Sequence, residues 1–221
     1  MKYFAAMLAI CIAGCASEDP VSPTVPKANS IEAVSGGGQV AMYGSTLPNP
    51  LVVHVKDQFG RSFPGAVVTF AVTGTVFLNE YSVTTNASGN AQVTFNYGTR
   101  SGLDTVTATV GGVATPALFI ETGNPGIAAS LTIVSGNAQS ATAGTPLTND
   151  LVVLVTDVAG NGTPAADMVW TAAKGHPTYT RNATGADGKA RLHFTPGAGA
   201  NVVNVFVDLT PLTAAFTATG N

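Results

Sequence analysis

Few side chains of this chain are of a type that could do chemistry, and they lie far apart. The only two cysteines, Cys11 and Cys15, fall in the first fifteen residues, and the only histidines are His54, His176 and His193. A metal centre needs clustered ligands, and no Gly-x-Ser-x-Gly nucleophile motif is present. We therefore expect no enzyme activity, no metal, no cofactor and no small-molecule substrate.

Two aspartates, Asp57 and Asp157, recur at the same place in a repeat of 100 residues. A calcium site would need six to eight oxygen ligands, and no Asp-x-Asp cluster lies nearby. An aspartate can instead accept the backbone N–H two residues further on and so cap its own turn. We expect this turn-capping role for both residues.

The composition excludes a nucleic-acid partner. Charged residues make up 10% of the chain, against about 25% in typical proteins. Nine basic residues face twelve acidic ones, and no run of lysine or arginine forms a basic patch. Because both cysteines lie at the start, the rest of the chain contains no disulfide.

The chain repeats itself after residue 29. Residues 34–36 return as 134–136 and residues 51–53 return as 151–153, each after 100 positions. A period of this length is one whole domain. The turn-rich segment 124–126 marks the boundary. With the leader described below, the expected parts are residues 1–14, 15–29, 30–124 and 125–221.

Apolar residues alternate with polar ones within each repeat, as at Leu51, Val53 and Val55. Alternation with period two and many β-branched residues is typical of strands with one buried face. About seven short strands in each repeat predict an all-β fold of two tandem immunoglobulin-like β-sandwiches. Phe70 and Trp170 are the expected aromatic residues of the two cores.

The first residues have the pattern of a secretory signal peptide. Met1 and Lys2 precede an apolar run at 4–12, and Glu18 and Asp19 follow soon after it. A membrane span needs about 20 apolar residues, and this run is roughly half as long. A cleaved signal peptide over 1–14 is the prediction, and an uncleaved anchor is the alternative.

The segment 12–15, Ile-Ala-Gly-Cys, resembles the lipobox of bacterial lipoproteins. The resemblance implies cleavage before Cys15 and acylation of its sulfur and amino group, which gives a stable lipid anchor. Cys11 is the rival site, but Ile10 precedes it where the lipobox has a small residue. Ala16, rather than aspartate, follows Cys15 and favours the outer membrane.

Residues 15–29 read as a proline-rich linker between the anchor and the first domain. Pro20, Pro23 and Pro26 recur every third residue, which is the period of a polyproline II helix. Plain disorder is the alternative, and both describe a tether.

Several segments resemble the group 1 bacterial immunoglobulin-like domains of the invasin and intimin type. The resemblance is carried by residues 51–60, 64–65, 67–70, 85–91 and 105–110. The second repeat keeps Asp157, Gly160, Pro164 and Trp170, but loses the Thr/Ala alternation at 202–207. The resemblance covers residues 30–221. It implies rigid spacers or adhesive modules on cell surfaces.

One asymmetry between the repeats points to a covered surface. His54 is replaced by Leu154, so Val152 and Leu154 would lie side by side on a face that should contact water. Such apolar residues indicate a possible interface, with the first domain, a loop or another protein. Tyrosines are enriched at interfaces, and four are further candidates, expected to be mostly half-buried: Tyr43, Tyr81, Tyr97 and Tyr179.

These observations predict a lipid-anchored, non-enzymatic binding or structural protein of the bacterial cell envelope, facing the periplasm or the cell exterior. An adhesion-type or spacer role is the first hypothesis. An accessory periplasmic subunit that docks on a larger membrane protein complex and stabilises it is the alternative. The expected partners are the membrane, through the lipid anchor, and another envelope protein or complex.

Overall fold

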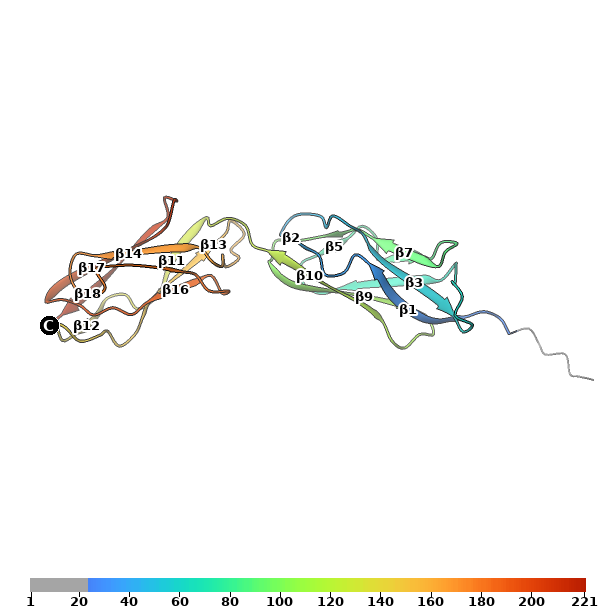
Figure 1. Ribbon diagram of the computed structural model, residues 1–221, viewed down its shortest axis with the longest axis horizontal. Helices are drawn as coiled ribbons and strands as arrows, with labels where there is room; N and C mark the ends of the chain where they lie inside the picture. Colours follow the sequence, from blue (N-terminus) through green and yellow to red (C-terminus); the bar gives the residue numbers. More distant parts are fainter. Residues whose placement is uncertain (1–23) are drawn as a thin grey trace, which may run out of the picture.

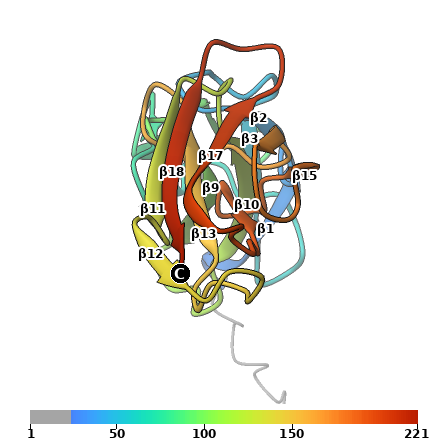
Figure 2. The ribbon, with the colours of Figure 1, turned by 90° about the vertical axis from the view of Figure 1, so that its left-hand side faces the viewer.

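The computed structural model describes residues 24–221. Every regular element in that range is a strand. The strands form two immunoglobulin-like β-sandwiches that lie end to end, and the C-terminal residue lies far from the segment that enters the first sandwich (Figure 1). Seen along the long axis, one sandwich lies behind the other (Figure 2). The predicted all-β tandem architecture is confirmed. The predicted signal peptide (1–14) and Cys15 lie outside the described residues.

The first sandwich has a three-stranded sheet in the order β1-β3-β7 and a five-stranded sheet in the order β2-β10-β9-β4-β6. A small hairpin, β5-β8, lies beside them. The strands are β1 (Ala28–Ser35), β2 (Val40–Met42), β3 (Leu51–Asp57), β4 (Val67–Val72), β5 (Phe77–Leu78), β6 (Ser82–Thr84), β7 (Asn90–Val93), β8 (Phe95–Asn96), β9 (Gly102–Val110) and β10 (Ala117–Asn124).

The second sandwich repeats this topology, with sheets β11-β13-β16 and β12-β18-β17-β14-β15. Its strands are β11 (Ser130–Ser135), β12 (Gln139–Ala141), β13 (Leu151–Thr156), β14 (Asp167–Ala172), β15 (Tyr179–Ala183), β16 (Lys189–Leu192), β17 (Gly199–Val207) and β18 (Thr213–Gly220). The strands outnumber the expected seven per repeat, because the first strand of each domain is split between two sheets and the first domain also contains the β5-β8 hairpin.

The predicted alternation places the core between the sheets. In β3, Leu51, Val53 and Val55 are fully buried, and the residues between them are half-buried. Phe70 and Trp170 are both buried in the cores of their domains. Each domain therefore encloses a hydrophobic core of its own, as the repeat pattern predicts.

A glycine lets the chain move from one sheet to the other in each domain. After β1 the backbone turns at Gly36 with φ +91°, and β2 then pairs in parallel with β10. A Cβ at Gly36 would lie 2.1 Å from the Pro50 carbonyl oxygen. Gly136 has the same φ and the same close approach to Asp150. The repeated glycine is thus a requirement of this crossing.

Candidate functional site

The repeated aspartates cap their turns, as predicted. Asp57 Oδ1 accepts the backbone N–H groups of Phe59 at 2.9 Å and Arg61 at 3.0 Å. Asp157 repeats both bonds in the second sandwich. Each turn follows the inner strand of the three-stranded sheet and lies at the end of its sandwich where the preceding chain enters.

In the second sandwich this turn builds the domain junction. Asp157 Oδ2 accepts the N–H of Gly126 in the connecting segment at 2.9 Å. The Asn161 side chain accepts the N–H of Ser101 and donates to the carbonyl of Thr99, both at 3.0 Å. Because Ser101 and Thr99 belong to the first sandwich, Asn161 joins the two domains directly.

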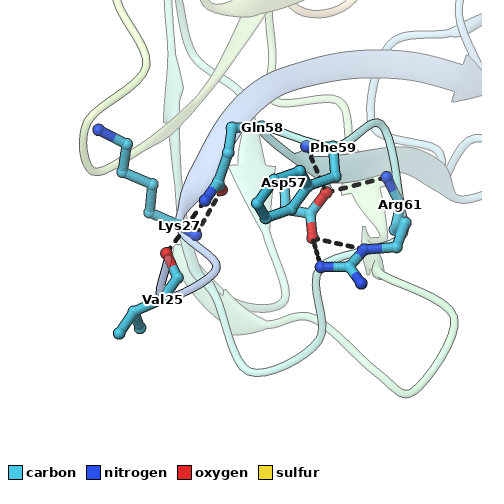
Figure 3. A network of polar contacts seen from close by, with 6 residues as sticks. All are labelled: Val25, Lys27, Asp57, Gln58, Phe59 and Arg61. Atoms are coloured by element: carbon cyan, nitrogen blue, oxygen red, sulfur yellow. Dashed lines mark hydrogen bonds and ion pairs between the residues drawn. The ribbon is translucent and has the colours of Figure 1, made fainter. Parts of the chain in front are cut away.

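In the first sandwich the same turn holds the chain that enters from the N-terminal side (Figure 3). The Gln58 side chain accepts the Lys27 N–H at 2.8 Å and donates to the Val25 carbonyl at 3.0 Å. Strand β1 begins at Ala28, earlier than the expected domain start at residue 30. The end of the predicted linker is therefore held against this turn.

An aromatic–arginine pair distinguishes the first turn from the second. Phe59 is 55% exposed, and the Arg61 guanidinium carbon lies 4.8 Å from its ring centre. The second repeat has Ala159 and Asn161 at these positions. Aligning the two turns would have singled out Phe59 and Arg61, which the sequence reasoning missed. A hollow of about 420 Å³ lies alongside, lined by Pro26, Asp57, Arg61, Ser62, Phe63 and Pro64.

Both turn carboxylates are held in the ionised form. Burial favours protonation of Asp57, but hydrogen bonds from Arg61 and Phe59 outweigh it and lower its pKa. Burial of Asp157 is likewise outweighed, and bonds from Asn161 and Gly126 lower its pKa. The junction therefore contains an anionic hydrogen-bond acceptor at neutral pH.

The outward residues Val152 and Leu154 lie on the same face of β13 and are both half-buried. Leu154 is flanked by Thr132 on β11 and Lys189 on β16, and Arg191 lies opposite Val152. The apolar pair is therefore bordered by two basic residues of its own domain.

A second apolar surface lies on the first sandwich. Leu118 and Ile120 project outward from β10 and are 55% and 56% exposed. With Val34 and the glycine loop 36–38 they border a shallow hollow of about 510 Å³. The matching residues of the second domain, Ala215 and Thr217, are smaller or polar. The sequence reasoning did not identify this surface.

The three histidines lie in separate places. His54 contacts Ser62 and Glu32, and His193 contacts Asp150. Within residues 24–221, no three His, Cys, Asp or Glu side chains are close enough to bind a metal ion together. The same part of the chain contains no helix long and apolar enough to cross a membrane.

The candidate tyrosines differ in exposure. Tyr81 and Tyr179 are exposed, and Tyr43 lies against the connecting segment, where a Cβ on Gly126 would be 2.9 Å from its ring. Tyr97 is wrong as a surface candidate, because it is buried and packs edge-on against Phe95.

Comparison with known proteins bears on the first domain and the overall fold. Residues 45–118 match the bacterial Ig-like domain (group 1) family. The InvD structure of Yersinia pseudotuberculosis aligns with a TM-score of 0.54 and 19% identity, over 87% of this chain and 57% of that one. The adhesin InvE of the same organism aligns with a TM-score of 0.39 and 20% identity, over 87% of this chain and 58% of that one.

The bacterial integrin-binding protein invasin aligns with a TM-score of 0.40 and 19% identity, over 89% of this chain and 40% of that one. This chain thus spans well under two thirds of each of these structures. A comparison with curated protein sequences finds no match. At 19% identity the likeness to InvD concerns the fold.

Proposed function

We propose that this protein is a lipid-anchored, non-enzymatic binding or structural module of the bacterial cell envelope, of the adhesion or spacer type. The observation that carries the proposal is the end-to-end pair of sandwiches joined by Asn161 and Asp157. A bonded junction keeps the far end of the second domain away from the end where the chain enters (Figure 1). That arrangement suits a spacer or a presented binding surface.

The anchor of this proposal is Cys15, and the chain faces the periplasm or the cell exterior. The Gln58 turn supports the tether, because it holds Val25 and Lys27 against the end of the first domain. A chain held there leaves the sandwich at the end opposite the second domain. Lipid on Cys15 would then place the second domain farthest from the membrane.

An accessory subunit of a larger envelope complex is the second candidate function. The exposed pair Leu118 and Ile120 favours it, together with the outward residues Val152 and Leu154. Apolar surfaces of this kind on a protein with few charges mark contacts with other proteins. The partner would be an envelope protein or protein complex.

The first experiment tests the lipid anchor, which both candidates share. A C-terminally tagged chain is expressed in a bacterial host, the membranes are separated, and the mature N-terminus is analysed by mass spectrometry. We expect an acylated Cys15 as the first residue and membrane association, which Cys15→Ala abolishes. Cys11→Ala is the matched control and should leave both unchanged. An unmodified Cys15 sulfur on membrane-bound protein would refute the anchor.

The same membranes, extracted in mild detergent, separate the two functions. Recovery of the tagged chain alone supports the spacer or adhesion role. A stoichiometric membrane protein that stays with it through purification supports the subunit role instead.

A further inference from the structure

Two buried carboxyl side chains and a buried tyrosine lie together inside the first domain, next to the junction. Tyr97, Asp104 and Glu121 are 3%, 8% and 0% exposed. Asp104 on β9 and Glu121 on β10 are direct cross-strand partners, and both side chains face the interior. Residues paired in this way have Cβ atoms about 4.5–5.5 Å apart. We call these three residues the acid cluster.

The polar atoms of the acid cluster have few hydrogen-bond partners. Glu121 Oε2 accepts the Gln39 N–H at 2.7 Å, but Glu121 Oε1 and the Tyr97 hydroxyl have no hydrogen-bond partner among residues 24–221. Buried polar atoms are normally paired. Within the same residues no ion pair reaches Asp104 or Glu121, and Arg100 on the adjacent loop is exposed. The two carboxyls therefore lack a cation.

Burial shifts all three groups toward the protonated form. Desolvation raises the pKa of Glu121, partly opposed by backbone hydrogen bonds from Gln39 and Gly38. Desolvation alone raises the pKa of Asp104. Desolvation, with Glu121 and Asp104 nearby, raises the pKa of Tyr97 to about 12.

The second domain shows that the fold does not need these acids. There the equivalent cross-strand pair is Asn201 with Ala218. The Asn201 side chain accepts the Gly197 N–H at 3.0 Å and donates to the carbonyls of Gly197 and Gly199. A neutral, fully bonded side chain therefore does the structural work at this position in the sister domain.

The acid cluster adjoins the residues that hold the second domain. Tyr97 and Asp104 bracket the loop that carries Thr99 and Ser101, the two partners of Asn161. Strand β10, which carries Glu121, continues into the connecting segment. A change in charge inside the acid cluster therefore acts on the loop and the strand that end at the junction.

We propose that Asp104 and Glu121 form a proton-binding site, which tightens the first domain and its junction when protonated and loosens both when the two carboxyls ionise. Both groups bind protons more strongly in the folded chain than in the unfolded chain. Their contribution to stability is therefore complete when the pH is below the ordinary pKa values of Asp and Glu. This contribution is lost as the pH rises through the raised pKa values of the folded chain. Asp157 faces the junction from the other domain and has the opposite pH dependence. Because its pKa is lowered, its contribution to stability is lost only as the pH falls below the ordinary aspartate value.

The test uses the two-domain chain at about pH 5 and about pH 8. Amide hydrogen exchange, corrected for the intrinsic rate, follows β9, β10 and the loop between Tyr97 and Asp104, and calorimetry follows unfolding. Trp170 is the only tryptophan, so its fluorescence assigns the transition of the second domain. We expect the melting temperature of the first domain to be higher at pH 5 by about 5–11 °C, the shift that a tenfold change in the folding equilibrium gives a domain of this size.

Two variants remove the charge with little change of shape. Asp104→Asn copies the residue of the sister domain, and Glu121→Gln keeps the length of the side chain. Each should reduce the pH difference, and the double variant should abolish it. Glu80→Gln, which neutralises an exposed acid of the same domain, should keep the wild-type difference. If the double variant does not fold, the single variants decide.

Three outcomes would overturn the proposal. The first is a first domain whose exchange and melting are the same at both pH values. The second is a pH difference that is as large in both single variants as in the wild-type chain. The third is stabilisation by calcium ions at pH 8 equal to that by acid and absent from Asp104→Asn, which would show a metal site instead.

Discussion

At the scale of single residues, two differences between the repeats decide what the capped turn binds: Gln58 against Val158, and Arg61 against Asn161. Asn161 presents an amide that both donates and accepts, so it can serve Thr99 and Ser101 of the neighbouring domain together. Arg61 can only donate, and it turns back to Asp57 at 2.9 Å. The same turn is therefore a junction in one domain and a holder of the entering chain in the other.

Asn161→Ala should loosen the junction without unfolding either domain. It removes three side-chain bonds, to Ser101, Thr99 and Asp157, each worth about 0.5–1.5 kcal/mol. We expect a broader distribution of distances between spin labels placed on the two domains. Arg61→Ala, at the matching position of the first domain, should leave that distribution unchanged. Equal distributions for all three chains would show that Asn161 does not hold the junction.

At the scale of elements, the crossing from the outer strand of one sheet to the edge of the other constrains the sequence most. Gly136 follows β11 and precedes β12, and its positive φ and close approach to the Asp150 carbonyl leave no room for a side chain. Gly160 also has a positive φ, but nothing lies within 4 Å of where its Cβ would be. The two glycines separate the effect of space from that of backbone angle.

Gly136→Ala should therefore destabilise the second domain much more than Gly160→Ala. The first change combines a left-handed backbone with a Cβ 2.1 Å from a carbonyl oxygen, and we expect a loss of about 3 kcal/mol or more. The second should cost about 1–2 kcal/mol. Urea unfolding followed by Trp170 fluorescence measures both. Similar losses would mean that the crossing can shift to accept a side chain.

At the scale of the whole molecule, two domains of one fold differ in the charges they bury. The first encloses Asp104 and Glu121, whose pKa values are raised by burial. Both domains bury a turn aspartate, Asp57 or Asp157, whose pKa is lowered by its hydrogen bonds, but only the first adds acids with raised pKa values. The domains are therefore expected to respond differently to acid.

Acidification below the ordinary aspartate value of 3.8 should destabilise the second domain. A carboxyl with a lowered pKa stabilises the fold above its ordinary value and loses that contribution as the pH falls through the folded value. We expect the urea midpoint, followed by Trp170 fluorescence, to fall between about pH 4 and pH 2. Asp157→Asn should have a smaller fall. A midpoint that stays constant to pH 2 would contradict the linkage.

The sequence predicted much of the fold and little of the candidate surfaces. Leu51, Val53 and Val55 show their burial by alternation alone, because side chains of a strand point to opposite faces. Asp57 and Asp157 reveal their caps because the bond is local. No local pattern reveals the role of Asn161, since its partners lie about 60 positions earlier in the chain. No local pattern marks Phe59 and Leu118 as exposed, because exposure depends on which face the fold leaves uncovered.

The sequence by itself determined the repeat, the strand period and the turns, and it predicts an anchor at Cys15, because each of these can be read from short runs of neighbouring residues. Only the tertiary structure decided that Asp104 and Glu121 are cross-strand partners with buried side chains and that the loop beside them meets Asn161. Strand pairing and domain contact bring distant residues together, and no local pattern records which charges will then share one buried space.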